Sequence, residues 1–357
     1  MSKLWREAAS IIIAGRTNVF KCSKITDSKI NGKFSPDYKI LVLKRGKSSR
    51  FFPGGYVFPG GATANEDSCQ EWLNIYESLG FKPELLKILT SNSPTVPLFS
   101  DNSKPLHKSI SLRITAIRET FEESGILLCR SQKDSTPSNW AAYMSGHQLQ
   151  EWQKIVQNNA YEFLNLCKEF KCFPDIWSLH LWSNWLTPTN NPIRFDTAFF
   201  LATIDQLPPS FMNDLEMDDM KWCHPQELLQ GNIQDSVWLP PPQYYEMSRI
   251  VTYQNIDQLN NFAVERSKHG CERWMPVQKK AKDGIICFLP GDEQYPQKID
   301  CNIKDKMGEL EGTMKNLRSS SRNIHRMELY ENQGTKIFIS NVEPISGHTL
   351  PNTNSKL

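Results

Sequence analysis

The stretch that decides the fold of this 357-residue chain is Arg118-Glu119-Thr120-Phe121-Glu122-Glu123-Ser124-Gly125. On an α-helix, at about 100° per residue, Glu119, Glu122 and Glu123 share one face. Ile114 and Ile117 lie on the opposite face and are predicted core residues. Three neighbouring carboxylates repel one another unless a cation neutralises them, and hard oxygen ligands suit Mg²⁺ or Mn²⁺. The segment therefore predicts a metal-binding helix, and the alternative is a solvated acidic face.

A glycine-rich segment upstream places this helix in a larger motif. Phe58-Pro59-Gly60-Gly61 is followed by Glu66, and the Arg-Glu-x-x-Glu-Glu-x-Gly pattern comes later. This order of residues resembles the Nudix box, the motif of hydrolases that cleave diphosphates linked to a nucleoside. In that family seven residues separate the first glutamate from the arginine, whereas 51 residues separate Glu66 from Arg118. The box therefore carries an insertion of 44 residues.

The resemblance implies a role for each residue of the box. Glu119 and Glu123 match the family's metal-ligand positions. Glu122 is implied as a third ligand or as the group that orients water, so Glu122 and Glu123 are the candidate catalytic carboxylates. Arg118 is expected to pair with a box carboxylate and hold the loop. The Gly60-Gly61 pair has no Cβ, which lets its backbone approach a metal or a phosphate closely.

A second signature precedes the box and indicates the substrate class. Coenzyme A-cleaving Nudix enzymes carry two arginines and a glycine before Phe-Pro-Gly-Gly. Arg45, Arg50 and Gly54 stand in register with that signature, while Leu43 and Gly46 depart from it. A guanidinium matches phosphate geometry in a forked contact, so both arginines are predicted to bind the substrate's phosphates. The interrupted box resembles the peroxisomal acyl-coenzyme A diphosphatases of the nucleoside diphosphate-linked moiety X motif 19 type.

These resemblances imply an α/β fold, the Nudix α/β/α sandwich with a helical insertion inside the box and a C-terminal extension. They imply hydrolysis of the diphosphate of coenzyme A and acyl-coenzyme A esters with Mg²⁺ or Mn²⁺. The products would be adenosine 3′,5′-bisphosphate and 4′-phosphopantetheine or its acyl form. A Nudix hydrolase of another diphosphate, such as ADP-ribose, NADH or a nucleotide cap, is the nearest alternative. A non-catalytic Nudix-fold binding module is the other, although such proteins usually lose the carboxylates that this chain keeps.

Turn signals and changes of composition divide the chain. We predict a Nudix domain over residues 1–235, an insertion at about 67–110, a C-terminal extension over 236–340 and a tail over 341–357. Strands are predicted at 11–15, 38–45, 177–186 and 194–204, where branched and aromatic residues gather. Helices are predicted from about 68 to 79, over 83–89 and as one amphipathic helix over 148–170. Segment 222–229 is predicted to pass from strand to helix.

Two further groups are candidates for the site. Nudix enzymes often draw another metal ligand or base from an acidic loop near the end of the domain, and Glu216 stands in such a loop here. The alternative for Glu216 is a solvated loop position. Trp182 and Trp185 are candidates for stacking on adenine, but burial in the core is the favoured interpretation.

Composition excludes several classes of protein. Hydrophobic residues make up 39% of the chain and the net charge is +2, with acids and bases dispersed. Neither a nucleic-acid groove nor a polybasic membrane patch is expected, and the longest apolar run is too short to span a bilayer. The nine cysteines form no Cys-x-x-Cys pair, which favours reduced thiols over a disulfide framework or a zinc site.

The last three residues are Ser355-Lys356-Leu357, a peroxisomal address that an import receptor reads. The polar run at 346–354 is expected to be mobile and to present that address. The alternative compartment is the mitochondrion, because Lys3, Arg6 and Arg16 give the N-terminus a weakly basic character.

Overall fold

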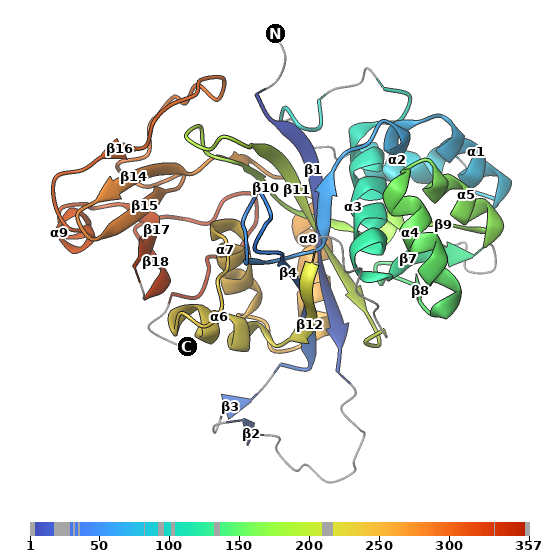
Figure 1. Ribbon diagram of the computed structural model, residues 1–357, viewed down its shortest axis with the longest axis horizontal. Coiled ribbons are helices and arrows are strands. Elements are labelled where there is room, and N and C mark those ends of the chain that lie inside the picture. The colour runs from blue at the N-terminus through green and yellow to red at the C-terminus, as the bar shows by residue number, and fades with distance from the viewer. Residues whose placement is uncertain are drawn as a thin grey trace.

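The protein is described by a computed structural model over residues 4–17, 29–30, 33–34, 36–81, 83–91, 96–100, 104–131, 136–208, 217–331 and 333–353. Its centre is a sheet in the order β12-β4-β1-β11-β10-β13, with β5 paired to β4 and β6 paired to β1 (Figure 1). β1 pairs with β11 in parallel and with β4 in antiparallel orientation. The strands are β1 (Arg6–Arg16), β4 (Tyr38–Arg45), β5 (Tyr56–Val57), β6 (Gly60–Ala62), β10 (His180–Leu186), β11 (Phe195–Ile204), β12 (Met217–Cys223) and β13 (Arg273–Trp274).

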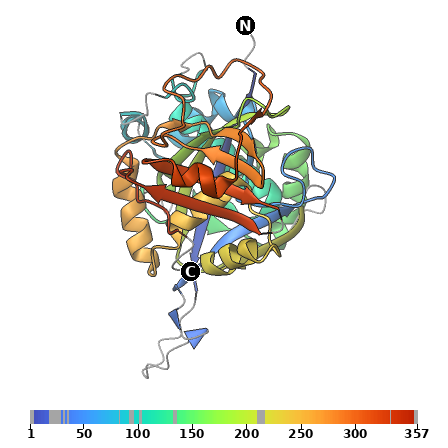
Figure 2. The same ribbon diagram turned by 90° about the vertical axis from the view of Figure 1, so that its left-hand side faces the viewer.

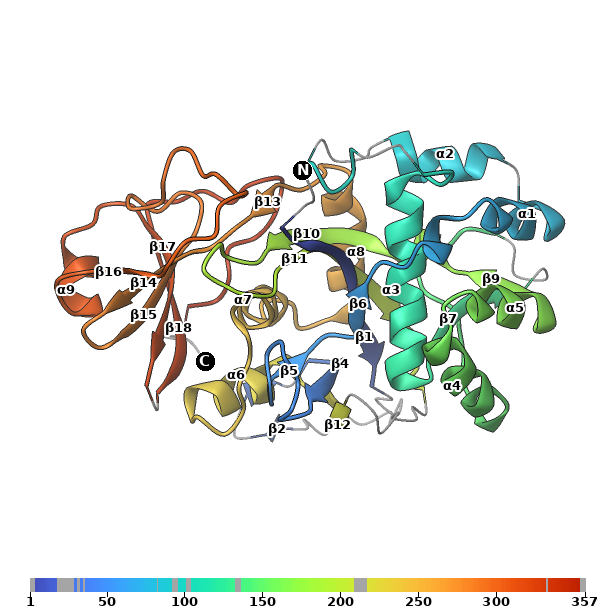
Figure 3. The same ribbon diagram turned by 45° about the horizontal axis from the view of Figure 1, so that its top comes forward.

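β1 separates two hydrophobic cores because its side chains alternate between the faces of the sheet. Ile11 and Ile13 pack into the core on the side of α3, whereas Ile12 and Ala14 pack on the side of α7 and α8. Figure 3 shows α3 on one side of the sheet and α7 and α8 on the other. The predicted α/β/α layering is therefore confirmed. The helices nearest the sheet are α3 (Lys108–Ser124), α6 (Pro225–Ile233), α7 (Pro241–Ile250) and α8 (Ile256–Ser267).

The insertion is helical and packs outside α3. The Trp72 and Phe163 rings lie 5.5 Å apart, and the Tyr76 hydroxyl donates to the Pro174 carbonyl at 3.0 Å. These contacts tie the insertion to segments that follow the box. The elements of this layer are α1 (Glu71–Ser78), α2 (Pro83–Ser91), α4 (Gln150–Asn158), α5 (Glu162–Glu169) and the small sheet β7 (Leu127–Ser131), β8 (Tyr143–Met144) and β9 (Cys172–Pro174). A separate hairpin joins β2 (Lys29–Ile30) to β3 (Lys33–Phe34).

The predicted single helix over 148–170 is wrong, because the chain breaks between α4 and α5. Asn159 is extended (φ −151°, ψ 107°), and its side-chain oxygen accepts the Tyr161 N–H at 3.1 Å. An asparagine side chain that binds the backbone offers an alternative to the helical ladder. The strand predicted at 177–186 begins only at His180, because Ile176–Ser178 form a 3₁₀ turn. The strands predicted at 11–15, 38–45 and 194–204 are confirmed.

The C-terminal part forms a second sheet in the order β16-β14-β15-β17-β18, which faces the viewer in Figure 2. Its small core contains Ile286, Phe288 and Met314. Arg326 and Asp292 form an ion pair inside this part, with Nε and Oδ2 2.7 Å apart, and both residues are buried. The elements are β14 (Val277–Ala281), β15 (Gly284–Phe288), β16 (Gly308–Glu309), α9 (Met314–Ser319), β17 (Ile324–Tyr330) and β18 (Gly334–Ser340).

Helix α7 joins the two parts through buried polar contacts. The Glu246 carboxylate accepts the indole N–H groups of Trp182 at 2.8 Å and Trp185 at 2.7 Å. The neighbouring Tyr245 hydroxyl lies 2.6 Å from Nε2 of His325 in β17. Both tryptophans are buried, so the core interpretation of these residues is confirmed. Because α7 binds β10 and β17 at once, it fixes one sheet against the other.

The segment at 346–354, expected to be mobile, is instead packed against the molecule over its described residues. The His348 ring is buried 4.5 Å from Trp182. The Arg249 guanidinium donates to the Thr349 carbonyl, and the Asn352 N–H donates to the Ser248 carbonyl at 2.7 Å. The polar composition of the tail gave no sign of this packing, because its backbone binds Ser248 and Arg249 of α7 and its one histidine packs against Trp182 of β10. Ser355, Lys356 and Leu357 lie outside the described residues.

The sequence predicts no membrane span and no disulfide framework. No helix in the described residues is long and apolar enough to cross a bilayer. Eight of the nine cysteines fall in the described part, and all eight are unpaired thiols.

The buried pair of Asp292 and Arg326 predicts a large loss of stability on substitution. Asp292→Ala leaves a buried guanidinium without its partner, which costs about 3–5 kcal/mol. The control Glu265→Ala removes an exposed partner of Lys268 and should cost under about 1 kcal/mol. Urea unfolding of both variants measures the difference, and equal small losses would contradict the assignment.

Candidate active site

Local signals set both ends of the helix that carries the carboxylates. Nδ1 of His107 accepts the Ser109 N–H at 3.1 Å and caps the start of α3. Gly125 ends the helix in the left-handed region at φ 69°, where its N–H donates to the Phe121 carbonyl at 2.8 Å. Glu123 lies two residues before this stop, in the last turn of α3. The helix therefore presents its carboxylates at a defined end.

The glycine pair lies directly against these carboxylates. The Gly60 N–H donates to Oε2 of Glu123 at 2.9 Å. A Cβ on Gly61 would lie 2.2 Å from Oε2 of Glu119, and a Cβ on Gly60 (φ 148°) would lie 2.4 Å from the Ala9 carbonyl oxygen. Only glycine lets β6 come this close to α3. The structure thus brings both predicted glycines to the two outer glutamates of the box.

Arg118 is the centre of the ion-pair network behind the site. Its guanidinium contacts Glu119 at 3.0 Å, Glu122 at 2.6 Å and both carboxylate oxygens of Asp67 at 2.7 and 2.9 Å. It also donates to the Ala62 carbonyl at 3.1 Å. Burial alone would lower the pKa of Arg118, but the ion pairs, first that with Asp67, hold this pKa well above its ordinary value. Arg118 therefore stays charged and joins α3, β6 and the start of the insertion.

The acidic partner of Arg118 at the start of the box is Asp67 and not Glu66, the residue at which the motif places the first glutamate. Asp67 is buried and also accepts from the Thr115 hydroxyl at 2.7 Å and from the Ala64 N–H at 2.9 Å. Glu66 precedes it in a 3₁₀ turn and is partly exposed. With five intervening residues, Gly60 leads to Glu66 and Gly61 leads to Asp67. A one-residue shift in a turn selects which carboxylate points inward.

The carboxylate cluster has more negative charge than Arg118 compensates. Burial raises the pKa of Glu119 to about 7; the Arg118 charge opposes this rise and the Glu122 charge adds to it. Among the described residues, no group of three His, Cys, Asp or Glu side chains is already arranged so that it could hold a metal ion. The oxygens of Glu119, Glu122 and Glu123 are nevertheless the donors that a hard divalent cation prefers. An added positive charge would relieve their repulsion, so these residues fit such a cation.

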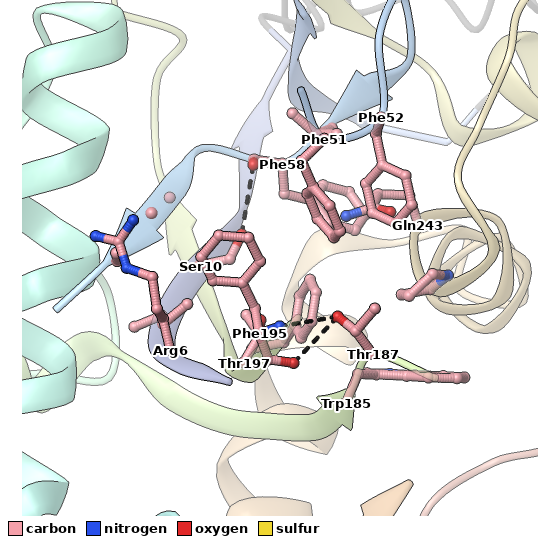
Figure 4. A pocket seen from close by; sticks show the side chains of 18 of the residues that line it. Arg6, Ser10, Phe51, Phe52, Phe58, Trp185, Thr187, Phe195, Thr197 and Gln243 are labelled. Atoms are coloured by element: carbon pink, nitrogen blue, oxygen red, sulfur yellow. Dashed lines mark hydrogen bonds between the residues drawn. The ribbon is translucent and has the colours of Figure 1, made fainter. Parts of the chain in front are cut away.

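A cavity of about 410 Å³ opens in front of the three box glutamates. Gly60, Gly61, Arg6 and Ser10 line it beside the carboxylates, and aromatic side chains line the rest. Figure 4 shows Arg6 on the side of α3, with Phe52, Gln243 and Trp185 on the opposite side of the cavity. Ligand pockets of this size bury most of a small ligand. The cavity is therefore the candidate active site.

The two predicted phosphate-binding arginines lie in different surroundings. Arg45, at the end of β4, lines the cavity and its Nε donates to the Ser49 hydroxyl at 3.0 Å. Arg50 is exposed on the loop between β4 and β5 and is not part of the cavity wall. The role of both arginines stays a prediction. Glu216, the other candidate, lies outside the described residues.

Several cavity residues carried no recognisable signal in the sequence. Arg6 and Ser10 come from β1, and Gln243 comes from the first turn of α7, far along the chain from the box. The sequence indicated Trp185 as a candidate for adenine stacking or for the core. The side chain packs in the core and also lines the cavity. Only the tertiary structure places these residues together.

Comparison with known protein families decides the identity of the fold. The NUDT19 Nudix domain family matches residues 5–250, which include the whole interrupted box. This protein belongs to the NUDT19 family of Nudix proteins. The NUDT19 C-terminal domain family matches residues 279–340, which form most of the second sheet. The resemblance found in the sequence is thereby confirmed, whereas the domain limits at 235 and 340 stay predictions.

Full-length relatives and a solved structure agree with this assignment. The protein is 36% identical to an acyl-coenzyme A diphosphatase NUDT19 of Xenopus laevis, over 98% of this chain and 96% of the relative. It is 31% identical to the Homo sapiens protein of that name, over 97% and 94%. The crystal structure of a Nudix hydrolase from Alicyclobacillus acidocaldarius matches with a TM-score of 0.50 and 21% identity, over 72% of this chain and 96% of that one. The last likeness confirms the fold.

The two neighbouring acids at the start of the box predict opposite results on substitution. Asp67→Ala removes a buried carboxylate that holds Arg118, so it should cost about 3 kcal/mol or more. Glu66→Ala removes a partly exposed carboxylate and should change stability by under about 0.5 kcal/mol. Thermal and urea unfolding measure both. A larger loss for Glu66→Ala than for Asp67→Ala would contradict the assignment of Asp67 as the partner of Arg118.

Proposed function

We propose that this protein hydrolyses the diphosphate of coenzyme A and acyl-coenzyme A esters, releasing adenosine 3′,5′-bisphosphate and 4′-phosphopantetheine or its acyl form. Relatives named acyl-coenzyme A diphosphatase match nearly the whole chain, which supports this substrate class. One structural observation carries the hydrolytic part of the proposal. Three carboxylates and the Gly60 N–H converge on one wall of a single cavity.

Nudix hydrolases generally need a divalent metal, and we propose Mg²⁺ or Mn²⁺ for this one. Glu119 and Glu123 are the proposed ligands, with Glu122 as a third ligand or the group that orients water. When bound, the cation would neutralise charge on the phosphoryl oxygens and lower the pKa of a water molecule. The buried, mutually repelling carboxylates support this assignment.

The chain's own groups hold the remaining parts of the site. Glu122 or Glu123 accepts the proton of the attacking water, since both carboxylates line the cavity. Arg118 is a positioning residue, because it contacts Glu119 and Glu122 from behind and does not line the cavity. Arg45 is proposed to bind a phosphate at the cavity wall, and Arg50 to do so from the exposed loop.

A Nudix hydrolase of ADP-ribose, NADH or a nucleotide cap remains the alternative substrate assignment. The experiment that decides between them is a substrate panel with Mg²⁺ and with Mn²⁺, in which the products are identified by mass. Release of adenosine 3′,5′-bisphosphate from coenzyme A supports the proposal. Cleavage of ADP-ribose with coenzyme A untouched would overturn it.

The role of Glu123 predicts a loss of turnover without a loss of fold. Glu123→Gln should lower kcat by roughly 10²–10⁴, because it removes a proposed ligand and a candidate base. The matched control Glu77→Gln changes an exposed glutamate of α1 and should keep normal turnover. Coenzyme A hydrolysis and melting temperature are measured for both. A folded Glu123→Gln enzyme with normal kcat would remove Glu123 from the site.

The proposed role of Arg45 and Arg50 in phosphate binding can be tested by substitution. Loss of a charge-assisted contact costs about 1.5–3 kcal/mol, so Arg45→Ala should lower kcat/KM for coenzyme A roughly 10- to 150-fold. Arg50→Ala is measured beside it, because that side chain is not part of the cavity wall. Dephospho-coenzyme A lacks the 3′-phosphate. If a variant loses equally on both substrates, its arginine does not contact the 3′-phosphate.

We propose a peroxisomal location, addressed by Ser355-Lys356-Leu357 through an import receptor, with the mitochondrion as the alternative. Deleting these three residues leaves the contacts of His348 and Asn352 in place. The truncated enzyme should therefore stay active and move to the cytosol. Imaging beside peroxisomal and mitochondrial markers measures this. An unchanged distribution after truncation would mean that the ending is not the address.

A further inference from the structure

Arg6 is a cation at the active-site cavity that neither sequence motif indicated. It begins β1 and lines the cavity together with Ala8 and Ser10, which lie on the same face of that strand. β1 pairs with β6, whose Gly60 and Gly61 lie against the box glutamates. Figure 4 shows the Arg6 side chain on the side of α3, the helix that carries those glutamates. Arg6 therefore lies beside the wall at which the diphosphate is proposed to bind.

The guanidinium of Arg6 is open to a ligand. Among the described residues it forms no ion pair and no hydrogen bond, and it lies over the Phe195 ring at 5.9 Å from the ring centroid. The side chain is exposed at the cavity. Arg118, in contrast, is bound by the box carboxylates, and Nε of Arg45 donates to the Ser49 hydroxyl. Of these three arginines, Arg6 is the one whose guanidinium donors are all available.

The residues on both sides of Arg6 hold its backbone in place. The Arg6 N–H donates to the Arg194 carbonyl at 3.0 Å. Before it, the Trp5 ring lies against the Arg194 guanidinium, with 5.3 Å between Cζ and the ring centroid. After it, Glu7 forms an ion pair with Lys108 at the start of α3. The backbone of Arg6 is therefore anchored to β11 and to α3, while its side chain keeps its freedom to meet a ligand.

The wall beside Arg6 has an imbalance of charge. When ionised, Asp67 and the three box glutamates bring more negative charge than Arg118 and one divalent cation together neutralise. A bound diphosphate adds further negative charge at the same wall. A guanidinium with open donors offsets that charge, because its planar fork matches the oxygens of a phosphate.

We propose that Arg6 binds the phosphoryl oxygens of the substrate's diphosphate, which makes it a substrate-binding residue outside both sequence motifs. The inference rests on the proposed function and deepens it by assigning a further contact to the scissile group. The diphosphate is common to coenzyme A, dephospho-coenzyme A and ADP, whereas of these three only coenzyme A carries the 3′-phosphate. This difference separates a contact to the diphosphate from a contact to the 3′-phosphate.

Substitution of Arg6 tests the contact in turnover. Arg6→Gln removes the charge and should lower kcat/KM for coenzyme A and for dephospho-coenzyme A by the same factor, at least about tenfold. Arg6→Lys keeps the charge without the fork and should recover part of the loss. The matched control Arg322→Gln changes an exposed arginine outside the cavity and should alter neither substrate. Melting temperatures of all variants show whether they are folded.

Binding of nucleotides tests the same contact without metal and without turnover. ADP has a diphosphate and no 3′-phosphate, whereas adenosine 3′-monophosphate has only the 3′-phosphate. Calorimetry in EDTA measures the affinity of the wild type, Arg6→Gln and Arg322→Gln for each nucleotide. Arg6→Gln should weaken ADP binding at least about fivefold and leave adenosine 3′-monophosphate unchanged.

Each outcome decides the proposal. Equal losses on the two substrates together with weaker ADP binding support it. A loss on coenzyme A alone would assign Arg6 to the 3′-phosphate and overturn it, and so would unchanged turnover and ADP affinity in Arg6→Gln. An equal loss in Arg322→Gln would trace the effect to net charge and also overturn it. If Arg6→Gln weakens ADP binding but the wild type fails to cleave coenzyme A, the proposed function alone is refuted.

Discussion

The ion pairs of Arg118 with Asp67, Glu119 and Glu122 are the constraint on which the rest of the site depends. A buried guanidinium requires carboxylate partners, and these partners come from the insertion border and from α3 itself. Its further bond to the Ala62 carbonyl holds the end of β6. This arrangement fixes the glycine pair against the glutamates, so the geometry of the active site follows from satisfying one buried charge.

The insertion changes the path of the chain but leaves this constraint intact. Asp67 stands just before the inserted helices and Arg118 well after them, yet the two side chains meet at 2.7 Å. The inserted helices pack against α5 and β9 on the outer side of α3, away from the cavity. A long excursion at this point costs little loop-closure entropy when its ends are already held together. The box is interrupted in sequence and continuous in space.

Helix α7, which lies within the match to the Nudix domain family, connects the active site to the second sheet. Its Glu246 binds Trp182 and Trp185 of β10, and Tyr245 binds His325 of β17. These buried contacts hold Pro241, Pro242 and Gln243 at the cavity wall. Pro276 and Gln278, which lie beyond the match to the Nudix domain family, also line the cavity, so the chain after residue 250 contributes to the cavity wall as well.

Local sequence determined much of this protein. The spacing of Glu119, Glu122 and Glu123 on one helix, the glycines that let β6 approach it and the branched residues of β1 and β4 all act over a few residues, so their structures follow from elementary stereochemistry. The family motif indicated the reaction, which is the metal-dependent hydrolysis of a diphosphate. Only the tertiary structure decided that Asp67 and not Glu66 meets Arg118, that the tail packs on α7 and that Gln243 reaches the cavity. Each of these depends on contacts between residues far apart in the chain, and no local pattern encodes which partner a buried charge will find.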